Sequence, residues 1–200
     1  MSHIKLILRI WLAVVATLQL AGCSKTVQWE EEVPLNTGDT IWVTRRVTYS
    51  LKGGAGNPFD MAYRPDWAEA ISFEWSGKKY RYVGDAQVLL LAISPQTKQP
   101  VLIAMAANKS WNWKNNYRCT TPFYVQFVPK ANGRDWSWPP SIEPWLMNLP
   151  YNLMIHREKK QEVKPRYAAS DREKLDRTVA IQSPYLIRID PNFKTDSCLK

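Results

Sequence analysis

Histidine and cysteine are few in this chain of 200 residues, and their positions decide which reactions the sequence could support. The histidines are His3 and His156, and the cysteines are Cys23, Cys119 and Cys198. A Ser-His-Asp or Cys-His active site would need one of the two imidazoles. His3 lies in an N-terminal segment that we predict to be removed, which leaves His156 as the only candidate. His156 lies in a polar, charge-rich stretch without a nucleophile-elbow motif, and no CxxC motif or Cys/His cluster has the spacing of a zinc site. We therefore predict no catalytic residue, no metal site and no cofactor.

Carboxylate pairs are a second candidate chemistry, because a glycosidase uses one carboxyl group as acid and another as base or nucleophile. Sequence spacing does not show that any two carboxylates between residues 60 and 85 converge. The acidic run Glu30–Glu32 is predicted to face Arg45 and Arg46 across a hairpin, as cross-strand charge pairs. An acidic catalytic cluster is the alternative interpretation of this run. The carboxylates between residues 60 and 85 are Asp60, Asp66, Glu69, Glu74 and Asp85.

Tryptophan placement is the distinctive feature of the sequence, which contains ten tryptophans. Trp111 and Trp113 are two residues apart, as are Trp136 and Trp138. In an extended chain, residues i and i+2 point to the same side, so each pair could present two rings to a ligand. Paired rings beside amide and guanidinium groups suit sugar rings, and they also suit a membrane interface. The alternative, which we prefer, is that the rings are hydrophobic plugs closing the end of a sheet.

The N-terminal segment has the three parts of an export signal. Residues 1–9 carry two cations, and residues 10–20 form an apolar run broken only by Thr17 and Gln19. About 20 apolar residues are needed to span a bilayer, so this run is too short for a membrane helix. A charged start, a short apolar middle and an end of small residues are typical of a signal peptide.

The end of this segment, Leu20-Ala21-Gly22-Cys23, resembles the lipobox of bacterial lipoproteins. The resemblance covers residues 1–24 only. It implies that residues 1–22 are removed and that the Cys23 thiol accepts the lipid that anchors the protein to its membrane. Two or three acyl chains give stable anchoring where one would be marginal. In that family an Asp after the cysteine marks inner-membrane retention, so Ser24 implies the outer membrane of a Gram-negative cell. An ordinary secretory signal followed by a chance cysteine is the alternative.

Lipid attachment at Cys23 would leave Cys119 and Cys198 as the two remaining thiols. In an oxidising compartment an even pair predicts one disulfide, with two free thiols as the alternative. The bond would close a loop of 80 residues and, in the chain-entropy model, would stabilise the fold by at most about 4 to 5 kcal/mol.

The mature chain would run from residue 23 to residue 200, a length that suits one domain. Loss of Lys5 and Arg9 with the leader lowers the net charge from +9 to +7. A basic protein favours anionic partners such as phospholipid headgroups or acidic glycans. Nucleic acid attracts the same charge, but an exported protein rarely meets it, so we predict no nucleic-acid partner.

Alternating apolar and polar residues predict strands over residues 26–33 and 40–51, joined by a turn at Gly38. The apolar face of the second strand has one exception, Arg45. Residues 52–64 are glycine-rich, but their spacing fits neither a P-loop nor a Rossmann turn, so we expect a connector. After the connector we expect one helical turn over 65–70 and a hairpin over 71–83. Apolar strands buried on both faces are predicted over 88–93 and 101–107, and further strands over 123–128 and 185–189. An irregular segment is predicted over 129–149, and a short helix from Ser170 to about Val179.

Short strands in hairpin order, with at most two short helices, predict a mainly β fold: a single antiparallel sandwich or barrel-like domain. Together with the leader, this favours a lipid-anchored protein of the cell envelope with a non-enzymatic binding or assembly role. Its partners would be membrane lipid, through Cys23, and an envelope protein or a glycan. The alternative is a glycan-binding or glycan-cleaving envelope lipoprotein that uses the tryptophan pairs.

Overall fold

The computed structural model describes residues 24–54, 57–84, 86–105, 124–154, 163–171, 174 and 187–190. Most of these residues lie in β-strands, and the segment before β9 includes one short 3-10 helix, η1 (Pro144–Leu146). The strands are β1 (Ser24–Pro34), β2 (Thr40–Gly54), β3 (Asn57–Trp75), β4 (Lys78–Gly84), β5 (Gln87–Ile93), β6 (Pro100–Met105), β7 (Tyr124–Pro129), β8 (Trp136–Ser137) and β9 (Arg166–Tyr167).

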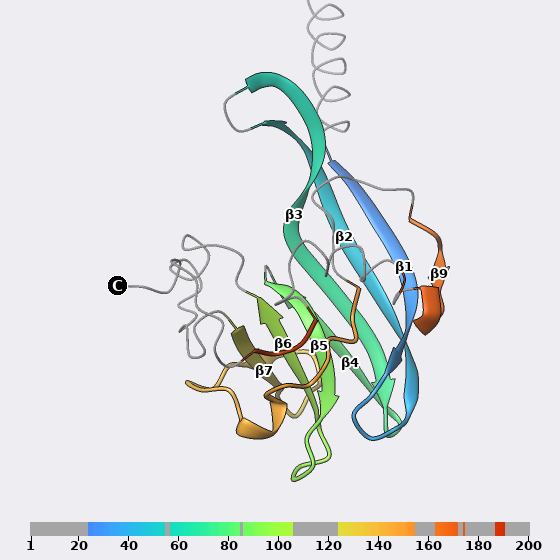
Figure 1. Ribbon diagram of the computed structural model, residues 1–200, viewed down its shortest axis with the longest axis vertical. Coiled ribbons are helices and arrows are strands. Elements are labelled where there is room, and N and C mark those ends of the chain that lie inside the picture. Colours follow the sequence, from blue (N-terminus) through green and yellow to red (C-terminus); the bar gives the residue numbers. More distant parts are fainter. Residues whose placement is uncertain are drawn as a thin grey trace, which may run out of the picture.

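The strands form two sheets (Figure 1). Five strands in the order β4-β3-β2-β1-β9 make the first sheet, and four in the order β5-β6-β7-β8 make the second. Neighbouring strands are antiparallel, except that β9 runs parallel to β1. In the described part of the chain the sheets do not close into a barrel. The predicted mainly β, antiparallel fold is confirmed, in its sandwich form.

Tight turns fix the register of the hairpins in the first sheet. The predicted hairpin over residues 71–83 is formed by β3 and β4, which are joined by Ser76 and Gly77. Both turn residues have positive φ, 49° and 71° respectively, which is the backbone of a type I′ turn. This turn matches the right-handed twist of the strands that it connects. The hairpin of β1 and β2 also has the predicted arrangement, with Val33 opposite Ile41.

The main core lies between the two sheets. On β1–β4 every second residue faces inward, so Val33, Val43 and Ile71 are almost completely buried, with Phe73, Tyr80 and Tyr82 alongside them. Side chains from the second sheet meet them, including Leu91, Leu102, Val125 and Phe127. Burying one such side chain stabilises the fold by about 1.5 to 3 kcal/mol.

The second sheet is covered on both faces, as its continuous apolar runs predict. Every residue of β5 is buried, and so are five of the six residues of β6. The face turned away from the main core packs against the segment that follows β8. That second cluster includes Leu89, Ile103 and Tyr124 from the sheet and Ile142, Leu146, Tyr151 and Ile189 from the covering chain.

Two asparagine side chains close the outer edge of β5. Asn152 accepts a hydrogen bond from Leu91 N at 2.8 Å and donates one to Leu91 O at 2.7 Å. Asn36 does the same for Ile93, at 2.7 and 2.9 Å. Asn152 Nδ2 also donates to Pro34 O at 2.8 Å, which ties this edge to the end of β1. The amide groups thus take the place of a neighbouring strand at an edge that could otherwise pair with another chain.

Two local predictions are wrong. The described residues of the expected connector over 52–64, which are 52–54 and 57–64, belong to β2 and β3, and these strands pair as far as Gly54 opposite Asn57. The expected helical turn over 65–70 also lies in β3, where Pro65 stands opposite Tyr49. Residues 66–68 face the single residue Thr48, so a bulge accommodates the proline, which cannot donate to the ladder. Pairing with β2 gives this segment more backbone hydrogen bonds than one isolated turn could.

The C-terminal segments for which we predicted a helix and a strand are described only in part. Residues 169–171 and 174 are helical, and the rest of the helix expected from Ser170 to Val179 lies outside the described residues. Of the strand expected over 185–189, residues 187–189 are described, and they form one antiparallel bridge, between Arg188 and Pro150.

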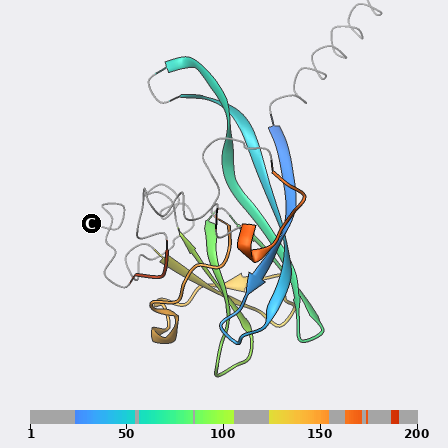
Figure 2. The ribbon, with the colours of Figure 1, turned by 45° about the vertical axis from the view of Figure 1, so that its right-hand side comes forward.

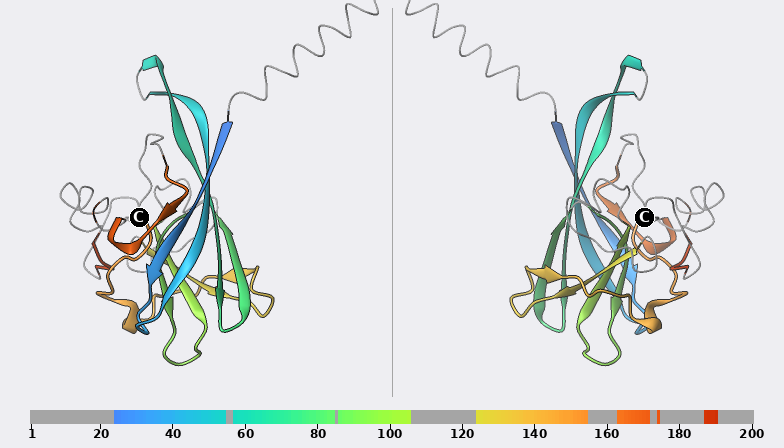
Figure 3. Two further views of the ribbon diagram at one scale, coloured as in Figure 1. Left: turned by 90° about the vertical axis from the view of Figure 1, so that its right-hand side faces the viewer. Right: turned by 90° about the vertical axis from the view of Figure 1, so that its left-hand side faces the viewer.

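The strands β2 and β3 extend beyond the part of the molecule in which the two sheets pack together. Figures 2 and 3 show β2 and β3 projecting past the region where the two sheets face each other. Ser24, the first residue of β1, pairs with Ser50, so the described part of the sheet is two-stranded beyond this point.

Candidate functional site

Three neighbouring strands, β1, β2 and β3, each place one charged side chain in the interior. Glu31 and Arg45 occupy inward positions, and β3 adds Glu69 beside them. The predicted charge pairing between the acidic run and β2 therefore holds for Glu31 and Arg45. Glu30 instead pairs with Arg166, with Nε 3.3 Å from the carboxylate.

The buried charges are joined by close contacts. Arg45 Nη1 donates to Glu31 Oε1 at 2.8 Å and to Met154 O at 2.9 Å, and Arg45 Nη2 contacts Glu69. Glu31 Oε2 accepts from Met154 N at 3.1 Å, and Glu69 Oε2 accepts from Val88 N at 3.1 Å. This buried cluster therefore links β1, β2, β3 and β5 to the chain at Met154.

Burial decides what the buried cluster can do. The side chains of Glu31 and Arg45 are 0% exposed and that of Glu69 is 2% exposed, so a substrate cannot reach them. Burial opposes the charged form of Arg45, but Glu69 and Glu31 outweigh this effect and raise the pKa of Arg45. A permanently charged guanidinium held by two carboxylates is a structural connection between strands. The alternative of an acidic catalytic cluster over Glu30–Glu32 gains no support from this geometry.

An accessible groove lies on the outer face of the first sheet, which is the face turned away from the second sheet. Register places Glu30, Thr44, Ser72 and Arg81 in one row across β1 to β4. The groove has a volume of about 530 Å³. Its lining includes three cationic and two acidic side chains. They are Lys79, Arg81, Arg134, Glu30 and Glu74.

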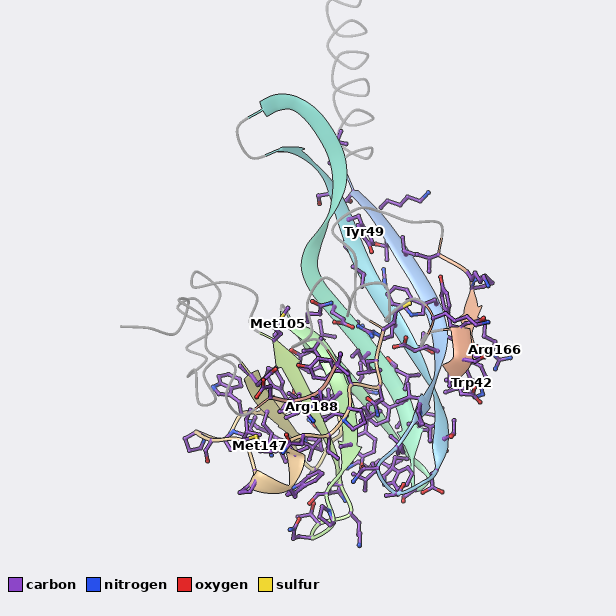
Figure 4. All side chains as sticks on the ribbon, in the orientation of Figure 1. Trp42, Tyr49, Met105, Met147, Arg166 and Arg188 are labelled. Atoms are coloured by element: carbon purple, nitrogen blue, oxygen red, sulfur yellow. The ribbon has the colours of Figure 1, made fainter. Side chains whose placement is uncertain are left out.

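Trp42 forms the aromatic side of this groove and is 40% exposed. The guanidinium of Arg166, on β9, stacks on the Trp42 ring at 3.8 Å from its centroid (Figure 4). Arg166 is oriented in turn by Glu30, its neighbour in the β1–β9 ladder. Cation–π contacts of this exposed kind contribute about 0.5 to 1 kcal/mol. The stack therefore holds a flat ring at the margin of a groove that also carries charged side chains, an arrangement that can bind a sugar ring or a peptide side chain.

The loop between β7 and β8 supplies Arg134 to the groove. Its preceding residue, Gly133, has a φ of 69° and accepts a hydrogen bond from Arg81 N at 2.9 Å. A Cβ at position 133 would lie only 2.8 Å from Lys79 O. Glycine is therefore required for the loop to lie against the edge of β4.

The two described tryptophans of the predicted pairs have different environments. Trp136 is half-buried, donates from Nε1 to Arg81 O at 2.8 Å and packs edge-on against Tyr82. This is the packing role that we preferred for these rings. Trp138 is 44% exposed and lines a smaller hollow of about 320 Å³ together with Val83, which is 62% exposed. Arg134 lines both this hollow and the groove.

Other candidate residues are placed only in part. Glu69 belongs to the buried cluster and Glu74 lines the groove, while Asp60 and Asp66 are positions in β3. In the ranges that the structure describes, no group of three or more His, Cys, Asp and Glu residues could hold a metal ion. Several candidates lie outside these ranges: Cys23, Asp85, Trp111, Trp113, Cys119, His156 and Cys198.

The groove was not predicted from the sequence, although the position of one residue indicates an exposed aromatic ring. Trp42 is an aromatic residue on the polar face of β2, among Thr40, Thr44 and Arg46. Alternation places the ring of Trp42 on the face of β2 that is turned away from the main core, where it is 40% exposed. Its partner Arg166 is 124 positions away in the chain, so local patterns could not connect the two.

No helix in the described ranges is long and apolar enough to cross a membrane. In comparisons with protein-family models, curated proteins and solved structures, the chain matches none of them.

Proposed function

We propose that this protein is a lipid-anchored lipoprotein of the bacterial cell envelope, attached through Cys23 to the outer membrane. The observation that carries the proposal is the sequence Leu20-Ala21-Gly22-Cys23 at the end of a charged and then apolar leader. Small residues before a cysteine suit cleavage by a lipoprotein signal peptidase, and the thiol accepts the lipid. Ser24 in place of Asp favours transfer to the outer membrane.

The body of the protein would act by binding, without catalysing a reaction. The accessible groove has a mixed set of charges, an exposed ring and the hydroxyl-bearing residues Thr44 and Ser72. By contrast, the described carboxylates that converge on one cation are buried with Arg45. An envelope protein or an envelope glycan would therefore bind the outer face of the first sheet.

Glycan binding is the second candidate, and the exposure of Trp138 favours it. Lys130, Arg134 and Asp135 surround this ring in the smaller hollow. A flat indole beside charged donors and acceptors can stack on the C–H face of a sugar and bond its hydroxyls. The ring of Phe127, which lies edge-on to Trp138 with 6.3 Å between the centroids, would support the indole.

The anchor is tested by expressing the full chain in a Gram-negative host and comparing it with the variants Cys23→Ser and Ser24→Asp. We expect the wild-type protein to incorporate a labelled fatty acid and to fractionate with the outer membrane. Cys23→Ser should lose the label and retain its leader, while Ser24→Asp should keep the label and move to the inner membrane. Equal labelling of wild type and Cys23→Ser would overturn the proposal.

A further inference from the structure

The first sheet extends past the residue that follows the anchor. Ser24 pairs with Ser50, but β2 continues to Gly54 and β3 begins at Asn57. We call the part beyond Ser24 the arm: residues Leu51–Gly54 and Asn57–Tyr63. At about 3.3 Å per residue, four residues of β2 carry the arm roughly 13 Å beyond Ser24. Figure 1 shows this hairpin at the end of the molecule where β1 begins.

An anchor at Cys23 would hold this end of the sheet against the bilayer. One residue spans at most about 3.6 Å, so Ser24 would lie within a few ångströms of the acylated residue. No linker separates the two, because Ser24 is already the first residue of β1. An arm that continues past Ser24 must then enter the headgroup region or, if the sheet is tilted, lie along it.

Residue types in the arm suit that location. Leu51 is 38% exposed, and the β3 side of the arm contains Phe59, Met61 and Tyr63. The residues opposite Gly53 form a four-residue bulge over 58–61, between the pairs Lys52–Ala62 and Gly54–Asn57. Aromatic residues are enriched at membrane interfaces, where their rings lie at the level of the headgroups.

The charge at this end of the first sheet also favours contact with an anionic membrane surface. Residues 24–28, 46–54 and 57–64 contain four cationic side chains and one acidic side chain. Each Lys or Arg near an anionic lipid surface contributes about 1 kcal/mol of attraction. The cations are Lys25, Arg46, Lys52 and Arg64, and the acidic residue is Asp60.

We propose that the arm is a second membrane contact, which binds the interface of the same bilayer that holds the Cys23 lipid. The inference rests on the proposed lipid anchor. Two contacts orient a rigid sheet where a single anchor would let it swing. The groove, whose row begins at Glu30, would then stand at most about 20 Å from the membrane surface, because Glu30 is six strand residues from Ser24.

Photo-crosslinking of the full lipidated protein tests the contact. A photoreactive amino acid is placed at Phe59 or Met61, and the protein is reconstituted in vesicles of phosphatidylethanolamine and phosphatidylglycerol. Exposed Gln96, in the turn between β5 and β6, is the matched control position. We expect lipid adducts at positions 59 and 61 in roughly tenfold excess over position 96. Residues at the membrane interface contact lipid, whereas the turn between β5 and β6 lies at the opposite end of the molecule from the arm (Figure 1).

Acylation of Cys23 is measured by mass on the same sample, which separates the two hypotheses. Acylated protein with no more adduct at 59 and 61 than at 96 overturns the arm contact alone. Protein without an acyl group overturns the anchor and, with it, the contact. As a second variant, Phe59→Asp with Met61→Asp should lower several-fold the adduct formed from a photoreactive residue at Leu51. An unchanged yield at position 51 would contradict the proposal.

Discussion

Arg45 Nη1 lies 2.8 Å from Glu31 Oε1, and both side chains are completely buried. Because Glu69 contacts the same guanidinium, two carboxylates depend on one cation. Removing a single partner from such a group leaves charge in the interior without compensation, whereas replacing the whole group with apolar residues can be tolerated.

Arg45→Met should destabilise the protein by about 3 to 5 kcal/mol, because Glu31 and Glu69 remain buried without their cation. Urea unfolding followed by circular dichroism measures this change. Arg46→Met, at the exposed neighbouring position, is the control and should change the free energy of unfolding by less than about 0.5 kcal/mol. Equal effects of the two substitutions would show that the buried cluster does not hold the strands together.

Asn152→Ala should cost about 2 to 4 kcal/mol, since it leaves Leu91 N and O unpaired at the edge of β5. The same variant should aggregate more readily, because an open strand edge can pair with another chain. Thermal unfolding and light scattering measure the two effects. Exposed Gln28→Ala is the control, and a loss no larger than the control's would contradict the assigned role.

Stability should fall at alkaline pH. Burial raises the pKa of Tyr49, Tyr80 and Tyr151 above the ordinary value, and for Tyr151 the neighbouring Tyr124 adds to the effect. In the unfolded chain these phenols ionise near pH 10, so the folded state binds the protons more tightly. Stability from this source is complete below about pH 10 and declines as the pH rises above it.

Tyr151→Phe should therefore flatten the alkaline decline, because it removes one buried phenol. Free energies of unfolding at a neutral pH and at several alkaline values give the slope. The Tyr151 hydroxyl donates to Tyr124 at 2.8 Å, so the variant should also lose about 1 kcal/mol at neutral pH. An unchanged alkaline slope would show that this phenol ionises equally in both states.

Binding at the outer face is tested by Trp42→Ala and Trp138→Ala in the lipidated protein. If the groove is the binding surface, Trp42→Ala should weaken retention by an envelope fraction roughly tenfold or more, as is typical of an aromatic residue that carries binding energy. Both variants must still unfold in one cooperative thermal transition, which shows that the sheets are intact. A loss confined to Trp138→Ala would favour the glycan candidate at the smaller hollow. No loss in either variant would contradict both surfaces.

The proposed bond between Cys119 and Cys198 predicts a single cross-linked peptide in a digest of the unreduced mature protein. Cys198→Ser should then lower the free energy of unfolding by at most about 4 to 5 kcal/mol. Wild-type protein treated with reductant is the control and should show the same loss. Free thiols at both positions, detected by alkylation before digestion, would rule out the bond.

Local patterns predicted the parts of this structure that depend on neighbouring residues. Alternation in β1 and β2 identified the hairpin and singled out Arg45 on an otherwise apolar face. The partner Glu69 could not be assigned, because it comes from β3, where the local sequence over residues 65–70 predicted a helical turn. Pairing with β2 overrode that signal.

Long-range partners account for most of what the sequence did not predict. Asn152 lies 61 positions from Leu91, and its role depends on how the chain returns to β5. The stack of Trp42 and Arg166 likewise depends on β9, a strand of two residues with no pattern of its own. By contrast, the apolar runs of β5 and β6 were identified because burial on both faces leaves a continuous signal.

Lipid attachment to Cys23 is tested most directly by the mass of the N-terminal peptide of the mature protein. Lipid attachment predicts that this peptide begins at Cys23 and carries the mass of a diacylglyceryl group, with or without a further N-acyl chain. A mature N-terminus at any other residue, or an unmodified Cys23, would contradict it.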